Sequence, residues 1–507
     1  MIKTPAENFT KIDRYLAALL VLLILALGVC RLKSGLSFWG DDHSAYISEG
    51  IAIAEGRFDE QTRINYFYHP TELPEEAENG RLVYAWGYPL QLAGVYKLFG
   101  FDRVRFSSVL YYKLPSLLCL ALTGGVLYLF LKRRFSALSA FCGALWFCIH
   151  PSVILWINRL YSDLAFLFFS MLSLLLMECY SERVRDEKPP VAMAVFFALS
   201  LLFTYATRLN GPAVCGVVLL GHGIFLWKNR ETGPRKLLLH MLPYLLFLLA
   251  AFGIEHFWLA PATGNAADID GSNFRDYVVY YLSLIRDFFA KPYGPGFGWF
   301  GIAVMLLSAL GILTNGVREN FHLSLLILGS LLVLVLLPYH QVMRYLLNLF
   351  PLMILFALYG LRFLLGRLPI EKLPGKARKV LALAFALLLT AYPLGSAAAE
   401  SLQERKTRDI PAFNDVYSPE AVEIYRYLQE NTPEDAIICF CKPRSLTLNT
   451  ERLAFKVDRN GHVLQDADYY LLNKREDLDY DLIGKTEIPM DLILENEGFA
   501  LYSIRKG

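Results

Sequence analysis

The feature that most constrains this chain is a series of apolar runs, each about as long as a membrane is thick. A helix needs roughly 20 apolar residues to cross the hydrocarbon core of a bilayer. Eleven runs of this kind can be counted before residue 400, separated by charged or Pro/Gly-rich breaks. They span residues 14–31, 106–131, 136–150, 160–179, 190–206, 211–228, 237–257, 298–314, 321–338, 345–365 and 379–396. The sequence therefore predicts an α-helical polytopic membrane protein with about 11 transmembrane helices.

Composition supports this class, because 55% of the 507 residues are hydrophobic and only 19% are charged. A soluble globular protein is rarely so apolar. The net charge of +2 gives no indication of a nucleic-acid partner. Membrane lipid is instead the expected surrounding of most of the chain.

Short basic loops predict the orientation, since Lys and Arg accumulate on the cytoplasmic side. The basic clusters at 132–134, 183–188, 228–236 and 367–379 all fall on one side if the N-terminus is cytoplasmic. The long loops, about 32–105 and 258–297, then lie outside, and eleven crossings place the C-terminal part outside as well. We expect a multi-pass protein of a bacterial inner (plasma) membrane with a periplasmic or extracellular C-terminal domain.

Past Ser396 charged residues become frequent and apolar runs shorten to the length of strands. We therefore divide the chain into a membrane domain, 1–400, and an exported soluble α/β domain, 401–507. The triplet Ser418-Pro419-Glu420 is a helix start, which predicts a helix over 419–430. Strands are predicted at 436–440, 468–473, 490–494 and 499–504. The sequence contains neither GxGxxG after a strand nor GxxxxGK[ST], so it does not indicate a nucleotide site.

An acidic segment, 39–46 (WGDDHSAY), follows the first apolar run. Placing carboxylates next to the hydrocarbon of a bilayer costs free energy, so such residues usually have a function. Asp41 and Asp42 are therefore candidate catalytic residues. The segment 44–56 has a helical pattern, and an acid at a helix start stays ionised and can accept a proton or bind a metal. Helix capping is the alternative for one aspartate, although less so for both. A divalent cation, Mg²⁺ or Mn²⁺, at Asp41, Asp42 and His43 is a second alternative, but no remote ligand clearly completes that site.

Three arginines lie at the predicted external ends of apolar runs: Arg159, Arg208 and Arg344. Any one of them could simply extend toward the interface. Together with the two aspartates they suggest a site for an anionic headgroup, because guanidinium matches phosphate oxygens with a planar fork of donors. Asp163, close to Arg159 in sequence, is expected to form a structural ion pair with it.

Four motifs accompany these residues in order: the acidic pair, GYPL at 87–90 before LFG at 98–100, RLNG at 208–211 and RYLL at 344–347. In this order the chain resembles the GT-C membrane glycosyltransferases. It is most similar to the bacterial branch related to protein O-mannosyltransferases and to the lipid A aminoarabinose transferase, glycosyltransferase family 39. The resemblance implies transfer of a sugar from a polyprenyl-phosphate donor to a hydroxyl of a protein, lipid or glycan at the external face.

The resemblance also implies roles for individual residues. Members of the family have an essential aspartate in the first external loop with an aromatic residue four positions on, which Asp42 and Tyr46 match here. Asp42 is then the general base of an inverting transfer, and Asp41 is the alternative. The chain departs from the family at His43, where glutamate is usual, and before the Pro-Leu pair, where some relatives have lysine. The implied substrate-binding residues are Arg208, Arg344, Arg159, Tyr46 and Tyr88.

A polytopic transporter or lipid flippase is the competing interpretation. Such proteins usually place ionisable groups near the middle of the membrane and contain internal repeats. Here the singled-out charges gather at one predicted face and no repeat is evident. The sequence therefore favours an enzyme.

Overall fold

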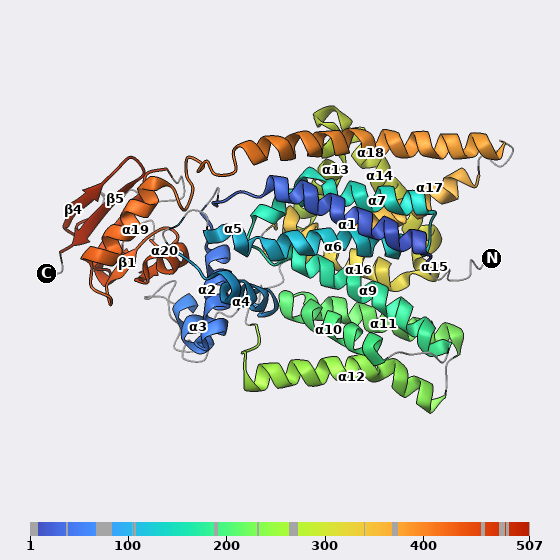
Figure 1. Ribbon diagram of the computed structural model, residues 1–507, viewed down its shortest axis with the longest axis horizontal. Coiled ribbons are helices and arrows are strands. Elements are labelled where there is room, and N and C mark those ends of the chain that lie inside the picture. Colours follow the sequence, from blue (N-terminus) through green and yellow to red (C-terminus); the bar gives the residue numbers. More distant parts are fainter. Residues whose placement is uncertain are drawn as a thin grey trace.

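The computed structural model describes residues 9–36, 39–66, 84–103, 105, 108–186, 191–230, 233–262, 272–338, 340–367, 374–457, 462–475, 482 and 486–505. Long helices run side by side along the longest axis of the molecule, and a small domain with a sheet sits at one end of them (Figure 1). The N-terminus lies at the opposite end. The middle part of the predicted long external loop, 67–83, lies outside the described residues.

Every predicted apolar run forms a helix. The matching helices are α1 (Lys11–Arg31), α5 (Ser108–Tyr112) with α6 (Leu114–Lys132), α7 (Ala137–Ile149), α9 (Asp163–Arg185), α10 (Val191–Thr207), α11 (Gly211–Asn229), α12 (Pro234–Phe257), α14 (Gly298–Gly311), α16 (Phe321–Val335), α17 (Phe350–Leu365) and α18 (Gly375–Lys406). Among the described residues, seven helical segments are long and apolar enough to cross a membrane. The pair Ala137–Ile149 and Pro151–Asn158, bent by 54°, gives an eighth, and α10, α16 and α17 are shorter apolar helices. The predicted helical membrane architecture is confirmed.

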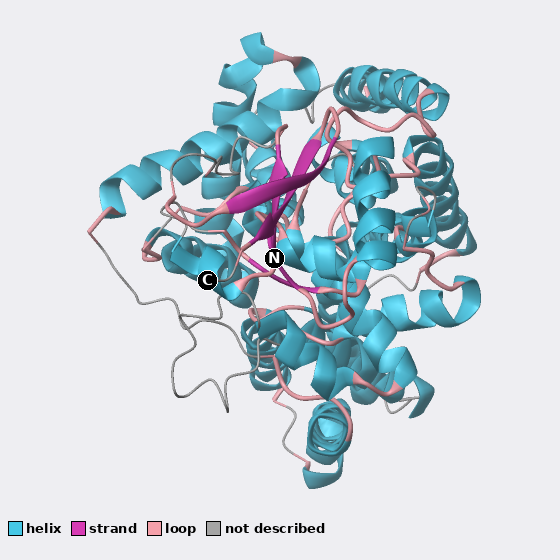
Figure 2. Cartoon of the chain, turned by 90° about the vertical axis from the view of Figure 1, so that its left-hand side faces the viewer, coloured by secondary structure: helices cyan, strands magenta, loops and turns pink. Residues whose placement is uncertain are grey.

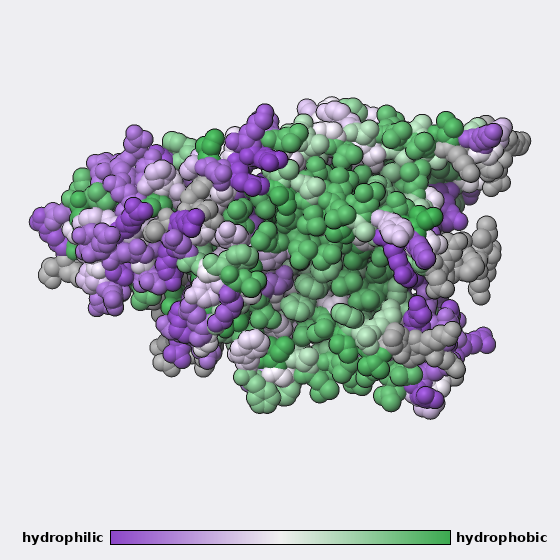
Figure 3. Space-filling model, viewed as in Figure 1, coloured by the Kyte–Doolittle hydropathy of each residue, from purple (hydrophilic) through white to green (hydrophobic). Residues whose placement is uncertain are grey.

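An apolar band covers the middle of this bundle and is flanked by polar surface at both ends (Figure 3). Leu249 on α12 and Leu388 on α18 are 69% and 73% exposed. The most apolar windows of α1, α12 and α18 are each only 22% buried, whereas those of the central segments Ser108–Lys132 and Asp163–Arg185 are 72% and 67% buried. Apolar surface on this scale is stable only in contact with lipid, so the outer helices face the hydrocarbon.

The segment after α1 forms α2 (Asp41–Glu55), α3 (Phe58–Tyr66) and α4 (Gly87–Phe99), which lie between the bundle and the C-terminal domain (Figure 1). The helical pattern predicted at 44–56 is present as α2. Gly87 opens α4 where its backbone approaches α10, since a Cβ there would stand 2.8 Å from the carbonyl oxygen of Ala206. The small residue of the GYPL motif thus brings α4 against the turn that carries Arg208.

Three more helical segments complete the membrane domain. They are α8 (Pro151–Ile154), α13 (Phe274–Ala290) and α15 (Val317–Glu319). Short 3₁₀ turns also occur at Leu155–Asn158, Lys291–Tyr293, Pro295–Phe297 and Met343–Leu346, and Ile312–Gly316 forms a π-helical turn. The turns Leu155–Asn158 and Met343–Leu346 position two of the predicted site residues, because Arg159 directly follows the first and Arg344 lies within the second.

The C-terminal domain contains α19 (Pro419–Asn431), α20 (Pro443–Thr450), a 3₁₀ helix at His462–Asp466 and one five-stranded sheet. The strands β1 (Ile437–Cys439), β2 (Leu453–Phe455), β3 (Tyr469–Asn473), β4 (Met490–Glu495) and β5 (Phe499–Ile504) are arranged in the order β2-β1-β3-β5-β4. Strand β1 is parallel to β2 and β3, whereas β5 is antiparallel to β3 and β4. Figure 2 shows this sheet in front of the end of the bundle.

The predicted helix at 419–430 is confirmed, and Ser418 caps it by accepting a hydrogen bond from the amide of Ala421. All four predicted strands are present, but β2 and α20 were missed. Strand β2 has only three residues and α20 only eight, so neither shows enough periodicity to be recognised in the sequence.

Candidate active site

The start of α2 is the point where the C-terminal domain and the helical bundle meet. The indole of Trp39 packs edge-on against Phe440 and Phe499, with ring centroids 5.3 and 5.8 Å apart. The hydroxyl of Ser44 lies 2.9 Å from that of Ser445 on α20. These contacts hold one side of α2 against the C-terminal domain. The opposite side of α2 therefore faces the helical bundle.

Asp41 and Asp42 lie on different sides of α2, because consecutive helical residues point about 100° apart. Asp41 is 9% exposed and accepts a hydrogen bond of 3.4 Å from the amide of Ser445. Burial raises the pKa of Asp41 to about 6, although Arg444 and Lys442 nearby partly oppose the shift. Asp41 therefore belongs to the contact between α2 and the C-terminal domain.

Asp42 points toward the membrane domain, and its side chain is 36% exposed. One carboxylate oxygen accepts a hydrogen bond of 3.1 Å from the hydroxyl of Tyr84, and the other lies 3.4 Å from both terminal nitrogens of Arg344. Arg344 comes from the 3₁₀ turn Met343–Leu346 just before α17, about 300 residues further along the chain. The predicted meeting of an acid and a remote guanidinium is thus present.

A second acid and arginine lie beside the first pair. Asp163, the first residue of α9, forms a salt bridge with Arg208 in the turn between α10 and α11. The guanidinium carbons of Arg208 and Arg344 each stand 5.1 Å from the ring centroid of Tyr345, and Arg344 also lies 4.9 Å from that of Tyr161. Aromatic faces hold both cations in place without neutralising them.

The expected partner of Asp163 was Arg159, and in the structure its salt bridge is made by Arg208 instead. Arg159 precedes α9 in an extended conformation, with φ −101° and ψ 124°, so it lacks the helical spacing that would bring it back to Asp163. Burial is the main cause that lowers the pKa of the Arg159 guanidinium, and Tyr161 opposes that shift. Burial raises the pKa of Tyr161, and Arg344 and Arg159 both oppose that rise, so Arg159 lies at the same end of the bundle as Arg344.

The two predicted tyrosines pack next to the acid and arginine pairs. The hydroxyl of Tyr46 is 3.1 Å from that of Ser162, next to Asp163, and its ring meets Tyr88 edge-on at 5.3 Å. Tyr88 is completely buried, with its hydroxyl 3.0 Å from that of Ser116. Tyr46 thus lines the site, whereas Tyr88 packs behind Tyr46.

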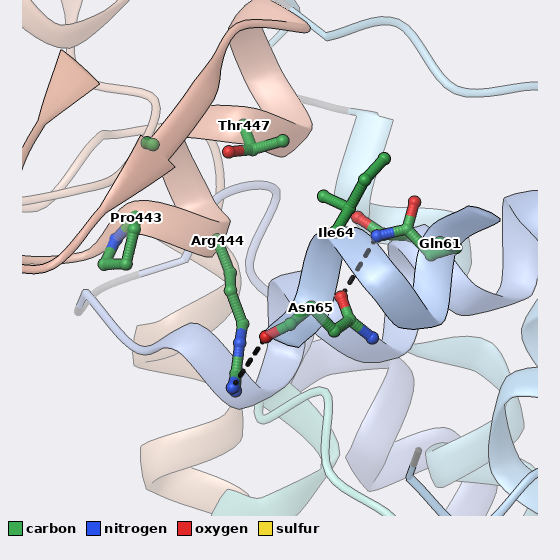
Figure 4. A pocket seen from close by; sticks show the side chains of 8 residues that line it. Gln61, Ile64, Asn65, Pro443, Arg444 and Thr447 are labelled. Carbon is green, nitrogen blue, oxygen red and sulfur yellow. Dashed lines mark hydrogen bonds between the residues drawn. The ribbon is translucent and has the colours of Figure 1, made fainter. Parts of the chain in front are cut away.

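Sequence reasoning missed the residue that the C-terminal domain contributes. Arg444 on α20 donates a hydrogen bond of 2.5 Å to the hydroxyl of Tyr84, which in turn donates to Asp42. Figure 4 shows Arg444 also reaching the carbonyl oxygen of Asn65 at the end of α3, at 3.4 Å, while Gln61 bonds the side chain of Asn65. An arginine in a separate domain carries no sequence signal that links it to Asp42.

Glu49, two turns after Asp42 on α2, was also missed. It is completely buried and accepts hydrogen bonds from the side chain of Asn65 at 2.8 Å and from the amide of Tyr84 at 3.2 Å. Burial raises the pKa of Glu49 to about 8, so its carboxyl is mainly protonated at neutral pH. Its role is to fix the backbone of Tyr84 below Asp42.

The geometry does not fit a cation shared by Asp41, Asp42 and His43. The three side chains occupy consecutive positions of α2 and diverge, and Asp42 faces an arginine. Burial lowers the pKa of His43 to about 3, and this side chain is completely enclosed. Over the described parts of the chain, no group of three His, Cys, Asp or Glu side chains is arranged to hold a metal ion.

Solved structures share this architecture. ArnT from Cupriavidus metallidurans, a lipid A aminoarabinose transferase bound to undecaprenyl phosphate, matches 96% of this chain and 97% of its own, with a TM-score of 0.53 at 13% identity. The oligosaccharyltransferase of Archaeoglobus fulgidus tethered to an acceptor peptide matches 92% of this chain and 69% of its own, with a TM-score of 0.54 at 10% identity. The chain has a GT-C fold. The resemblance inferred from the motifs is confirmed at the level of the fold.

A third GT-C structure is the archaeal oligosaccharyltransferase AglB with an inhibitory peptide and a dolichol-phosphate, which matches 91% of this chain and 69% of its own, with a TM-score of 0.53 at 11% identity. A further structure of the Archaeoglobus fulgidus enzyme is a complex with zinc and sulfate. No protein-family model and no curated protein sequence matches the chain. At such identities the GT-C likeness concerns the course of the backbone, so the chemistry must be argued from the side chains above.

Proposed function

We propose that the chain is a glycosyltransferase that moves a sugar from a polyprenyl-phosphate donor to an acceptor hydroxyl. One observation carries this proposal: Asp42, Arg344, Asp163 and Arg208 come together from four distant segments at the end of the membrane bundle, beside an exported-type domain. A lipid-linked phosphate sugar has its tail in hydrocarbon and its headgroup at the polar surface. This site lies at that boundary. The GT-C relatives that bind undecaprenyl phosphate and dolichol-phosphate support the same donor class.

Asp42 is the general base of the proposed reaction. Its carboxylate takes the proton of the acceptor hydroxyl while that oxygen bonds to the anomeric carbon from the face opposite the phosphate. The bond between the anomeric carbon and the phosphate oxygen breaks, and the configuration inverts. Partial exposure, a hydrogen bond from Tyr84 and loose 3.4 Å contacts with Arg344 leave Asp42 accessible to an incoming hydroxyl.

The leaving group is a lipid phosphate, which needs stabilisation of its charge more than a proton. Arg344 and Arg208 supply this stabilisation, since both are held on the faces of Tyr345 and point to the same end of the bundle. Arg159 extends the positive side of the site, and Tyr46 lines it. Asp163 orients Arg208 through their salt bridge. Asp41, the alternative base, is assigned to domain contact because its carboxyl is buried against Ser445.

We further propose that this end of the bundle is the external one, with the N-terminus in the cytoplasm. The basic loops support this orientation. The donor then reaches the site within the outer leaflet, and the acceptor approaches between the C-terminal domain and the membrane. No described residue of the site has the arrangement of a metal centre, so the proposed steps use only the side chains named here.

The test compares Asp42→Asn with Asp41→Asn in the purified full-length protein. Mass spectrometry of envelope lipids and glycans from cells with and without the protein first identifies the product. Release of polyprenyl phosphate is then measured with the matching donor. We expect Asp42→Asn to lower transfer about 1,000-fold with unchanged folding, and Asp41→Asn to retain it within about tenfold. Unchanged transfer in Asp42→Asn removes this residue from the mechanism. Movement of an intact donor across the membrane without release of phosphate indicates a transporter instead.

A further inference from the structure

A polar cleft lies at the end of the bundle opposite the candidate active site. It has a volume of about 960 Å³ and opens where α6, α9, α11 and α17 end and where α16 begins. Glu178 on α9 lies in its wall, 15 positions after Asp163, which corresponds to roughly 22 Å along the helix. The two sites therefore share helices but no residues.

The charges lining this cleft are unequal. Five cations face three carboxylates, and the carboxylates are already paired: Glu178 and Glu182 with Arg133 and Arg134, and Glu319 with Lys228 at 3.4 Å. The two remaining cations, Arg362 and Arg367 on and after α17, are exposed and form no salt bridge with any described carboxylate. The cleft thus has a positive excess at its α17 side.

A buried histidine in the same wall lacks a hydrogen-bond partner within the described part of the chain. His322 near the start of α16 is 6% exposed, and neither ring nitrogen has a hydrogen-bond partner among the described residues. Its ring lies flat on the backbone of Gly221, where a Cβ would come within 2.7 Å. Buried polar groups normally have partners, so an unpaired imidazole in a cleft wall points to a ligand that supplies the missing acceptor.

The helix between α14 and α15 is locally widened beside this histidine. Ile312–Gly316 forms a π-helical turn, and Thr314 and Asn315 of that turn line the cleft. Such turns interrupt the regular α-helical hydrogen bonding and are frequent at functional sites. This observation is independent of the charges and the unpaired imidazole, and it concerns the same cavity.

The lining also has an apolar part, formed by Met177, Ile224, Phe225 and Phe363, next to polar side chains such as Asn229 and Asn320. Leu313 within the π-helical turn and Val317 just after it are 70% and 57% exposed, so apolar surface adjoins the turn that lines the cleft. A ligand that fits here has a negatively charged head and an apolar tail. A soluble anion would leave the apolar part of a cavity of this size unfilled.

We propose that this cleft binds the phosphate headgroup of an anionic glycerophospholipid from the leaflet on the side of the N-terminus. Arg362 and Arg367 contact the phosphate oxygens, His322 donates a ring N–H to the headgroup, and Phe225 and Phe363 contact the first part of an acyl chain. Basic pockets between membrane helices are suited to such headgroups. The proposal does not depend on the glycosyltransferase assignment, because it concerns separate residues at the other end of the protein.

The experiment uses the full-length protein, purified and stripped of co-purifying lipid by detergent exchange. Binding of phosphatidylglycerol and of phosphatidylcholine with the same acyl chains is titrated by native mass spectrometry, and inorganic phosphate forms a third arm. The test variant is Arg362→Ala/Arg367→Ala. The matched control is Arg318→Ala, an exposed arginine of α15 at the same end that does not line the cleft.

We expect phosphatidylglycerol to bind wild-type protein and Arg318→Ala at least tenfold more tightly than phosphatidylcholine. In the double variant, binding should be about 30-fold weaker, the loss expected for two headgroup contacts. If the double variant fails to fold, as judged by its melting temperature, His322→Ala takes its place with an expected loss of about fivefold. Equal binding of phosphatidylglycerol to control and variant overturns the proposal. The proposal is also overturned if inorganic phosphate binds the wild type but not the double variant while the two lipids bind equally. That result would favour a soluble anion as the ligand.

Discussion

The two ends of the helical bundle both bring acids and arginines together, but they do so in different ways. At the end opposite the C-terminal domain, Arg133 bonds Glu178 at 2.8 Å and Glu182 at 2.6 Å, and these three side chains are 11% to 23% exposed. At the end beside that domain, Asp42 is 36% exposed and stays 3.4 Å from Arg344. The first arrangement is saturated by its own partners, whereas Asp42 keeps a partly exposed carboxylate with only long contacts to its arginine.

The two ends also differ in how many carboxylate oxygens of α9 have a hydrogen-bond partner. Asp163 pairs with Arg208 through one carboxylate oxygen, while its second oxygen is buried and has no hydrogen-bond partner among the described residues. Glu178, at the other end of the same helix, uses both oxygens on two arginines. A saturated ion pair contributes to the fold, whereas the second oxygen of Asp163, beside the proposed site, leaves an acceptor that a substrate could use. Under the proposed function, this difference distinguishes a structural from a functional acid on one helix, α9.

Glu178→Ala should have the largest effect on stability. The substitution leaves the guanidinium groups of Arg133 and Arg134 buried without their main partner, which is expected to cost about 3–5 kcal/mol. The melting temperature in detergent measures this loss. Glu182→Ala, which removes only one contact to Arg133, should have a clearly smaller effect. A similar melting temperature for wild type and Glu178→Ala would mean that this cluster is not structural.

Glu49→Gln should change how stability depends on pH, with an amplitude of about 4 kcal/mol between pH 5 and pH 8. Burial raises the pKa of Glu49 to about 8 in the folded state, above its ordinary value near 4.5. Between these two values the folded protein binds a proton that the unfolded chain releases. Wild-type stability therefore falls as the pH rises through this window, and glutamine, which does not titrate, removes that fall.

Melting temperatures of wild type and Glu49→Gln at pH 5 and at pH 8 check this prediction. Asp41 also has a raised pKa, about 6, and contributes in the same direction in both proteins. The difference between the two proteins isolates Glu49. If both lose the same number of degrees on going from pH 5 to pH 8, the carboxyl of Glu49 is ionised in the folded state.

The sequence predicted the membrane helices well because their length is set by the bilayer, and a run of 20 apolar residues rarely occurs outside a membrane span. Asp42 and Arg344 could be selected for a related reason, since charges next to such runs are unusual. Their contact also matches the prediction. Asp163 was assigned to Arg159, its neighbour in sequence, whereas Arg208 from another turn is its partner. Arg444 could not be found, because its role depends on how a domain 360 residues after Tyr84 docks on α2. Glu49 could not be found, because its partners Asn65 and the amide of Tyr84 reach it only through the fold of the segment that follows α2.

Arg344→Lys should lower sugar transfer much more than the same substitution at the opposite end of the bundle. Lysine keeps the positive charge but loses the planar fork and the stacking on Tyr345 and Tyr161, so we expect transfer to fall about 100-fold, or about 2.7 kcal/mol in the barrier. The melting temperature should change by only a few degrees. Arg133→Lys is the matched control, and it should lower the melting temperature while transfer by the folded protein stays near wild type. If Arg133→Lys lost transfer and Arg344→Lys kept it, the functional arginine would be Arg133 and the proposed site would be wrong.

Arg444→Ala should have the smallest effect, about tenfold on transfer, because Arg444 acts on Asp42 only through the hydroxyl of Tyr84. A positioning residue of this kind should lower kcat with little change in KM, and Arg444→Lys should restore part of the loss. The decisive measurement is a double-mutant cycle with Tyr84→Phe, which removes the linking hydroxyl. If Arg444 only fixes the domain to α3 through Asn65, its effect adds fully to that of Tyr84→Phe. If it orients Asp42, its substitution has no further effect once the hydroxyl is absent, and the C-terminal domain is then part of the active site.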